Sequence, residues 1–227
     1  MSTGLTSTVA IAMKDLRTEL RTKESINASA SFALVILVLF SFAFDIDREE
    51  FYAISGGLLW LVYSFAGALI VNRSFSRELP NDCLEILISS PAPAWSLFLG
   101  KSVAAFLSLL VVELISLPVF GLFYNIQWVP VFWPLFAIMI LATWGITIVG
   151  TGLSALTVNV RLREVMLPAM LYPLLIPVLI AAMQLTTALL GSEAVSLTRD
   201  SALRLLIVFD IVYSSLALYL IEFILVF

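Results

Sequence analysis

The sequence predicts an all-α polytopic membrane protein with six transmembrane helices, and three observations support this prediction. Of the 227 residues, 61% are hydrophobic and the mean hydropathy is +1.08, whereas soluble domains are about 45–50% apolar. Six apolar runs are long enough to cross a hydrocarbon core of about 30 Å at a rise of about 1.5 Å per residue. Lysine and arginine are also distributed unequally between alternate connecting segments.

The first element that we expect is an amphipathic helix at residues 8–23, lying in the membrane interface. Its apolar side chains recur at helical spacing: Val9, Met13, Leu16 and Leu20. Its basic side chains occupy other faces: Lys14, Arg17, Arg21 and Lys23. We do not expect a signal peptide, because the following apolar run is of spanning length and no small-residue cleavage site ends it.

The six membrane spans follow in order. We place them at residues 26–44, 51–71, 102–124, 131–158, 165–190 and 205–227, and we treat residues 1–227 as a single transmembrane domain. Glycines in the second span, and glycines, serines and threonines in the fourth, favour close helix packing. The fifth span contains Pro168, Pro173 and Pro177, which should kink or break its helix.

The positively charged residues fix the expected orientation. With the N-terminus in the cytosol, nine of the 12 lysines and arginines fall in cytosolic segments. Only Arg48, Arg199 and Arg204 fall outside. This bias predicts a bacterial cytoplasmic (inner) membrane protein with both termini and the loop at residues 72–101 in the cytosol.

The loop at residues 72–101 is the main candidate for contact with a soluble partner. It reads NRSFSRELPNDCLEILISSPAPAWSLFLGK, with a short apolar run between Pro80 and Pro91. This pattern predicts a short surface helix held just outside the membrane. The candidate docking residues are Arg73, Arg77, Glu78, Asp82, Leu84, Glu85, Leu87 and Ile88.

Several kinds of chemistry are excluded by the residue types present. The chain has no GxxxxGK[ST] nucleotide-binding loop and no GxSxG or HExxH motif, so we predict a non-catalytic chain with no catalytic residues. It has no histidine and a single cysteine, Cys83, which removes disulfides and the usual metal-binding patterns. We expect no metal site and no nucleic-acid partner, and we expect contact with the lipid bilayer.

Acidic residues and prolines inside the spans are candidates for intramembrane function. Glu113 should lie near mid-membrane, where an ionised group is costly. It either makes an interhelical hydrogen bond to the threonines and serines of the fourth span or acts in a substrate path or gate. Pro118, Pro173 and Pro177 are either packing kinks or gating hinges, and for Asp210 we favour a structural role nearer an interface.

The order of these features resembles the membrane subunit of a type-2 ABC exporter, with an interfacial helix, six spans and a cytosolic coupling helix between spans two and three. More narrowly, the chain resembles the CcmB family, the haem-exporter permease subunit of system I cytochrome c maturation. The segments that carry the resemblance are LRTELRTKESIN (16–27), FSFAFD (40–45), NRSFSRE (72–78), LEILISSP (84–91), LGK (99–101) and VELISLPVF (112–120).

The resemblance implies a subunit that couples ATP hydrolysis by a partner to release of a haem-loaded chaperone. It implies four partners, namely a CcmA-like ATPase, a CcmC-like haem-handling membrane protein, a small CcmD-like subunit and a CcmE-like haem chaperone. ATP would bind in the partner subunit, no cofactor would bind this chain directly, and haem would be a cargo. Two alternatives stay open: an exporter permease for a lipid, drug or polysaccharide, and an ATP-independent proton-coupled carrier that uses Glu113.

Overall fold

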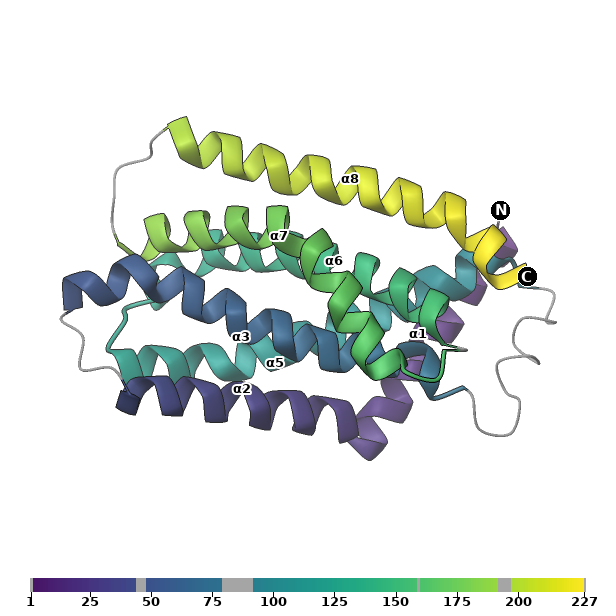
Figure 1. The fold of residues 1–227 in the computed structure, drawn as a ribbon, viewed down its shortest axis with the longest axis horizontal. Coiled ribbons are helices and arrows are strands. Elements are labelled where there is room, and N and C mark those ends of the chain that lie inside the picture. Colours follow the sequence, from purple (N-terminus) through teal and green to yellow (C-terminus); the bar gives the residue numbers. More distant parts are fainter. Residues whose placement is uncertain (1, 44–47, 79–91, 159, 192–196, 227) are drawn as a thin grey trace.

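The computed structural model describes residues 2–43, 48–78, 92–158, 160–191 and 197–226, and every regular element in these ranges is a helix (Figure 1). The elements are α1 (Ser2–Thr22), α2 (Glu24–Ala43), α3 (Arg48–Ser76), α5 (Ala94–Tyr124), the 3-10 helix η2 (Val129–Val131), α6 (Phe132–Thr157), α7 (Arg163–Leu190) and α8 (Leu197–Val226). Six helical segments in these ranges are long and apolar enough to cross a membrane. The all-helical prediction with six spans is therefore confirmed at this level.

A sharp turn at one residue separates α1 from the first span, α2. Lys23 adopts a left-handed conformation with φ of 54°, which lets the chain change direction without a longer loop. The side chain of Glu19 accepts a hydrogen bond of 2.8 Å from the backbone N–H of Ile26, in the first turn of α2. Because this N–H has no partner within its own helix, Glu19 stabilises the start of the span.

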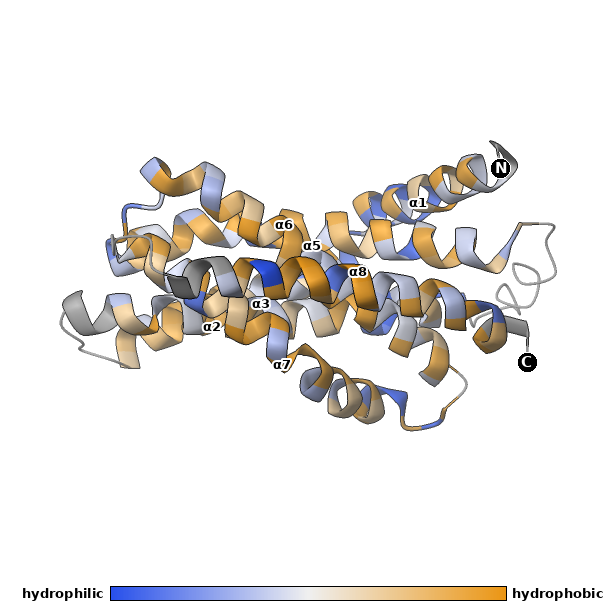
Figure 2. Ribbon diagram, turned by 90° about the horizontal axis from the view of Figure 1, so that it is seen from above, coloured by the Kyte–Doolittle hydropathy of each residue, from blue (hydrophilic) through white to orange (hydrophobic). Residues whose placement is uncertain are grey.

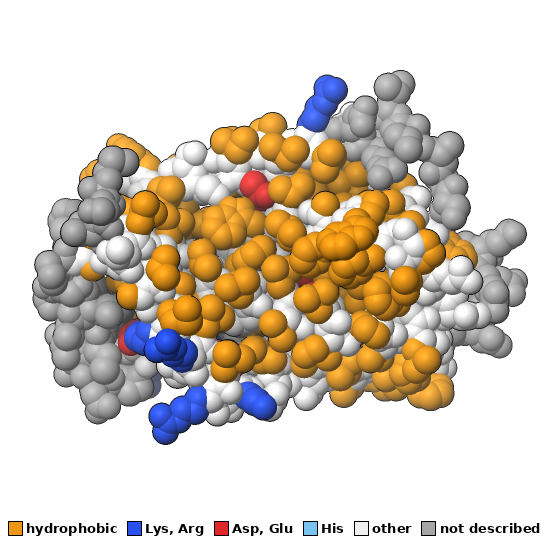
Figure 3. Space-filling view, turned by 180° about the vertical axis from the view of Figure 1, so that it is seen from behind, with side chains coloured by type: hydrophobic (Ala, Val, Ile, Leu, Met, Phe, Trp, Pro, Cys, Tyr) orange, Lys and Arg blue, Asp and Glu red, His pale blue; other side chains and the backbone are white. Residues whose placement is uncertain are grey.

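The third helix, α3, lies at the centre of the bundle. In its spanning window 72% of the residues are buried, against 17% for α2 and 22% for α8. It packs on α2, α5, α6 and α7, and its large side chains Trp60, Tyr63 and Phe75 are fully buried. Outer faces of the bundle remain apolar, and Figure 3 shows one such face, covered mostly by hydrophobic side chains. Such a surface matches lipid as its solvent.

Close packing depends on glycines at the helix contacts. A Cβ atom added to Gly56 of α3 would lie 2.5 Å from the carbonyl oxygen of Met183 in α7. A Cβ added to Gly150 of α6 would lie 2.8 Å from a methyl group of Val71. The expectation that small residues permit close approach of the spans is confirmed at these two contacts.

The helix α7 continues through all three of its prolines. Pro168, Pro173 and Pro177 lie inside the single element Arg163–Leu190. Figure 1 shows that α7 bends sharply along its length instead of running straight. A proline lacks the N–H that would bond to the preceding turn, and neighbouring helices can hold such a bend in place.

Several helices extend beyond the spans that were predicted from hydropathy. Residues 72–76 belong to α3 and 94–101 to α5, so both ends of the predicted loop 72–101 are helical. Residues 197–204, predicted as polar loop, form the start of α8. Figure 2 shows mostly hydrophobic colouring along the helices of the bundle, with hydrophilic residues among them. Backbone hydrogen bonding does not stop where the apolar run stops, whereas the predicted boundaries were set at charged residues.

Candidate functional site

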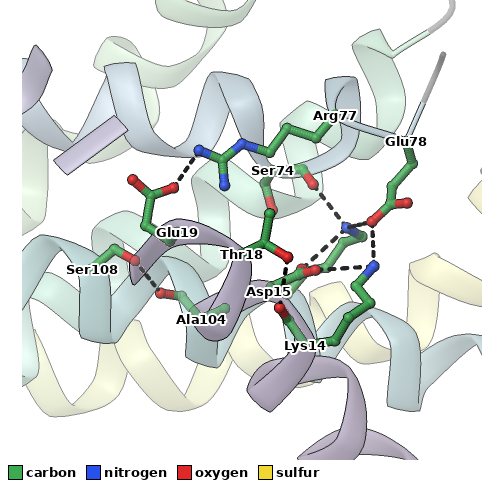
Figure 4. A network of polar contacts seen from close by, with 10 residues as sticks. Lys14, Asp15, Thr18, Glu19, Ser74, Arg77, Glu78, Ala104 and Ser108 are labelled. Carbon is green, nitrogen blue, oxygen red and sulfur yellow. Dashed lines mark hydrogen bonds and ion pairs between the residues drawn. The ribbon is translucent and has the colours of Figure 1, made fainter. Parts of the chain in front are cut away.

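The candidate site is a network of charged side chains where α1, the end of α3 and the start of α5 meet (Figure 4). Glu78 directly precedes the stretch 79–91, and Lys101 lies in the first turns of the helix that follows it. The network therefore sits at the base of the segment that the sequence predicts as a docking helix. Residues 79–91 themselves lie outside the described residues.

Lys101 is the centre of the network. Its side chain is only 1% exposed, and its Nζ donates to Glu78 Oε1 at 3.1 Å, to Asp15 Oδ2 at 3.2 Å and to the carbonyl oxygen of Ser74 at 2.9 Å. The same Nζ lies 5.2 Å from the centre of the Phe75 ring, within range of a cation–π contact. Three acceptors match the three donors of the ammonium group, so its charge is compensated despite burial.

Lys14 links α1 to the same carboxylate. Its Nζ lies 2.6 Å from Glu78 Oε1 and 3.1 Å from Asp15 Oδ1. Burial by itself raises the pKa of Glu78, but the charge of Lys101 and the hydrogen bonds from Lys14 and Lys101 outweigh it and lower that pKa. Burial likewise lowers the pKa of Lys14, but Glu78 and Asp15 outweigh it and raise the pKa. Both groups are therefore held in their charged forms.

A second pair of contacts ties α3 to the turn between α1 and α2. The Arg77 guanidinium donates to Glu19 Oε2 and, at 2.5 Å, to Ser25 Oγ. Burial raises the pKa of Glu19, but the backbone N–H of Ile26 and the Arg77 contact together lower it. Arg73 pairs with Glu24 at 2.5 Å, and both of these side chains are well exposed. The end of α3 is thus fastened to α1 and to the start of α2.

The predicted docking residues divide into two groups. Arg73, Arg77 and Glu78 contact α1 and α2 of their own chain. The remaining five predicted docking residues lie outside the described residues: Asp82, Leu84, Glu85, Leu87 and Ile88. Their predicted contact with a partner stays a prediction.

Sequence reasoning missed Asp15 and Glu19 and treated Lys101 as a loop residue. The structure places Lys101 inside α5, buried, because two carboxylates and a carbonyl group surround its charge. One signal was available in the sequence. Asp15 and Glu19 are the only acids between residues 2 and 22 and are spaced i, i+4, which puts both on one face of a helix that is otherwise basic.

The network is not a ligand pocket. The cavity beside it has a volume of about 40 Å³ and is lined by the paired side chains and by Ser108 and neighbours on α5. Such a space admits a few water molecules. Among the described residues no cluster of three or more acids or cysteines could hold a metal ion. The arrangement is suited to fixing helices relative to one another.

Glu113 makes an interhelical hydrogen bond in the bundle interior. Its side chain is fully buried, and Thr143 of α6 donates to its Oε1 at 2.7 Å. Its Oε2 has no hydrogen-bond partner among the described residues. The hydroxyl of Tyr63 donates to the backbone carbonyl of Glu113 at 3.3 Å, which adds α3 to the contact between α5 and α6. The alternative role in a gate stays a prediction.

Asp210 lies in α8, and its side chain is largely buried against neighbouring helices. Its expected place nearer an interface stays a prediction. A Cβ added to Gly145 of α6 would lie 2.9 Å from Asp210 Oδ1, so glycine at 145 makes room for the carboxyl group. Pro118 lies inside α5, as Pro173 and Pro177 lie inside α7.

Comparison with known proteins gives a family match over nearly the whole chain. A sequence model of the family described as "CcmB protein" matches residues 6–223. This chain belongs to the CcmB protein family. The family match includes the network, residues 79–91, five of the candidate spans and nearly all of the sixth, so the contacts described above belong to the part of the chain that matches the family.

The matches to curated CcmB relatives have low sequence identity but cover most of each chain. Heme exporter protein B of Rhodobacter capsulatus is 25% identical over 188 residues, which is 83% of this chain and 85% of the relative. Heme exporter protein B of Haemophilus influenzae is 27% identical over 76% of this chain and 77% of the relative. The protein of the same name from Pseudomonas aeruginosa is 29% identical over 70% and 71%.

Proposed function

We propose that this chain is the membrane subunit of an ABC-type haem-export complex, and that its charged network transmits the motion of a partner ATPase to the bundle. The observation that carries the coupling role is the position of Glu78 and Lys101. These residues flank the stretch 79–91 and pair with each other and with α1. The cargo class follows the relatives, which are named heme exporter protein B.

In this proposal a CcmA-like subunit binds and hydrolyses ATP and contacts the docking segment through Asp82, Leu84, Glu85, Leu87 and Ile88. Force on that segment reaches α3 and α5 together because the Glu78–Lys101 ion pair joins them. It reaches α1 through Lys14 and Asp15. The other partners would be CcmC-like, CcmD-like and CcmE-like proteins, with haem as cargo and release of the loaded chaperone as the result.

The proposed location is the bacterial cytoplasmic membrane, with both termini in the cytosol. Figure 1 supports part of this, since the start of α1 and the end of α8 lie at the same end of the bundle. That end also carries the network and the flanks of 79–91. Placing it on the cytosolic side would put the docking segment where an ATPase subunit has access to ATP.

The direct test is a mild-detergent purification of the tagged chain from its native membrane, followed by mass spectrometry and ATP turnover. We expect an ATPase subunit, a haem-handling membrane protein and a haem chaperone in the purified complex. Recovery of an ATPase without haem proteins would favour an exporter of another cargo. Recovery of no ATPase, under conditions that preserve other membrane complexes, would reject the proposal.

Charge exchange tests the coupling role within that complex. Arg77→Glu places a second carboxylate beside Glu19 and should lower ATP turnover several-fold. The double variant Glu19→Arg/Arg77→Glu restores a pair of opposite charges and should recover much of the lost turnover. Arg161→Glu, an exposed charge reversal between α6 and α7, is the matched control.

In the docking segment, Glu85→Lys or Leu87→Asp should lower turnover while the chain stays in the membrane. Normal turnover in all of these variants would exclude the coupling role.

A further inference from the structure

The helix α1 has three faces of different chemistry. One face carries Asp15 and Glu19, which are bound to Lys101 and Arg77 of the bundle. A second face is apolar and exposed, with side chains 46–63% accessible: Leu5, Val9, Met13 and Leu20. The third face lies between them on the outside and carries Arg17 and Arg21, both exposed. At about 3.6 residues per turn, spacings of four or seven residues keep the members of each set on one side.

The exposed surface of α1 has no compensating acid. Its two carboxylates point into the bundle, and among the described residues neither Arg17 nor Arg21 makes an ion pair. Arg17 and Arg21 therefore present two positive charges beside an uncovered apolar stripe. An anionic partner with an apolar layer next to its charged groups is complementary to this surface.

The depth of α1 is fixed by the chain itself. Only Lys23 separates it from α2, a span of 20 residues with a mean hydropathy of 2.1. A span of this length starts at the boundary of the hydrocarbon core. The end of α1 that carries Arg17, Leu20 and Arg21 consequently lies close to this boundary, where headgroups meet acyl chains.

We propose that α1 binds the headgroups of anionic phospholipids through Arg17 and Arg21. Its stripe of Leu5, Val9, Met13 and Leu20 inserts at the acyl boundary. Binding on this face stabilises the position of α1, and thereby the contacts that Asp15 and Glu19 make on the opposite face. The proposal depends on the membrane topology alone and does not depend on the cargo or on an ATPase partner.

The test uses the full chain reconstituted in nanodiscs with equal parts of phosphatidylglycerol and phosphatidylcholine, and mass spectrometry of the lipids that stay bound to it. We expect phosphatidylglycerol to be enriched on the parent chain. In the double variant Arg17→Gln/Arg21→Gln the enrichment should fall at least about fivefold, because one basic residue near an anionic membrane surface changes binding by about this factor. Arg17→Lys/Arg21→Lys keeps both charges and should retain most of the enrichment.

The matched control is Arg161→Gln/Arg163→Gln, which removes one charge from the α6–α7 connection and one from the first residue of α7, at the same end of the bundle (Figure 1). Equal loss in this control would overturn the proposal, since net charge alone would explain it. Unchanged enrichment in Arg17→Gln/Arg21→Gln would also overturn it. Competition by inorganic phosphate beyond that of sodium chloride at equal ionic strength would indicate a free-phosphate site instead of a lipid surface.

Discussion

At the scale of single residues, Lys101 illustrates how a charge can be accommodated at the end of a membrane span. Its ammonium group is nearly inaccessible, but it is surrounded by Glu78, Asp15, the Ser74 carbonyl and the Phe75 ring. Removing one partner of such a group costs more than forming the pair gains, because the other charges are left buried. The residues of the network are therefore energetically coupled.

We predict that Lys101→Met lowers the free energy of unfolding by about 3 kcal/mol, because Glu78 and Asp15 lose their common cation in a site with little water. Arg73→Gln should lower it by less than about 1 kcal/mol, since the Arg73–Glu24 pair is exposed on both sides. Thermal unfolding in one detergent, followed by intrinsic fluorescence, compares the two variants. Equal midpoints for Lys101→Met and the parent chain would contradict the description of Lys101 as the centre of the network.

The network also predicts a pH dependence. The pKa values of Glu78 and Glu19 are lowered from 4.5 in the folded protein, so their stabilisation is complete above pH 4.5 and is lost as the pH falls through the lowered values. The pKa of Lys14 is raised from 10.5, so its stabilisation is present below pH 10.5 and is lost at higher pH.

The thermal midpoint should consequently be highest in the range between these limits and fall below about pH 4.5. Glu78→Gln removes one of the two lowered carboxyl groups, so it should lower the midpoint near neutrality and weaken its dependence on acid pH. An acid dependence identical to that of the parent chain would show that other groups are responsible.

At the scale of helices, the contact between α3 and α7 relies on one of two adjacent glycines. A Cβ added to Gly56 would meet the Met183 carbonyl oxygen at 2.5 Å and the Thr187 hydroxyl oxygen at 2.5 Å, whereas one added to Gly57 would meet no heavy atom within 4 Å. The carbonyl group belongs to helix backbone and cannot move away alone. The two positions therefore differ in packing although their sequence context is the same.

We predict that Gly56→Ala lowers the free energy of unfolding by about 1–3 kcal/mol through overpacking between α3 and α7. Gly57→Ala should leave it unchanged or raise it by up to about 1 kcal/mol, because alanine has the higher helix propensity. Both variants are expressed, solubilised and measured in the same way. The difference between their thermal midpoints therefore reports the contact between α3 and α7. Equal effects would mean that α3 and α7 can separate without cost.

At the scale of the whole molecule, the bundle brings distant parts of the chain to one end. The start of α1, the end of α3, the start of α5 and the end of α8 all lie there (Figure 1). An even number of spans returns the chain to the end of the bundle at which the first span begins. The excess of lysine and arginine in segments at this end predicts that it faces the cytosol.

Cys83, the single cysteine of the chain, provides a test of that orientation. We predict that a membrane-impermeant maleimide labels Cys83 in inverted vesicles and leaves it unlabelled in intact spheroplasts. A variant with Cys83→Ser and Ile46→Cys, which moves the thiol to the segment between the first two spans, should show the reverse pattern. Labelling of Cys83 from the outside would invert the proposed topology.

The number and order of the spans could be predicted from the sequence, since each apolar run is long and is separated from the next by a segment that contains polar or charged residues. Their ends could not. Lys101 reads as the end of a polar loop until Asp15 and Glu78 are seen around it. Residues 197–204 read as a polar loop until α8 is seen to begin at Leu197. Hydropathy measures transfer of one segment into lipid and contains no information on the partners of a charge.

The sequence by itself determined the membrane class, the six candidate spans, the amphipathic pattern of the N-terminal helix and the family resemblance, because these depend on local composition and on the order of short motifs. Only the tertiary structure decided how the charges are used. It directed Asp15 and Glu19 into the bundle, left Arg17 and Arg21 outside, and turned Arg77 and Glu78 toward α1. These outcomes depend on pairs of residues far apart in the chain, and such pairs are formed by packing and not by local pattern.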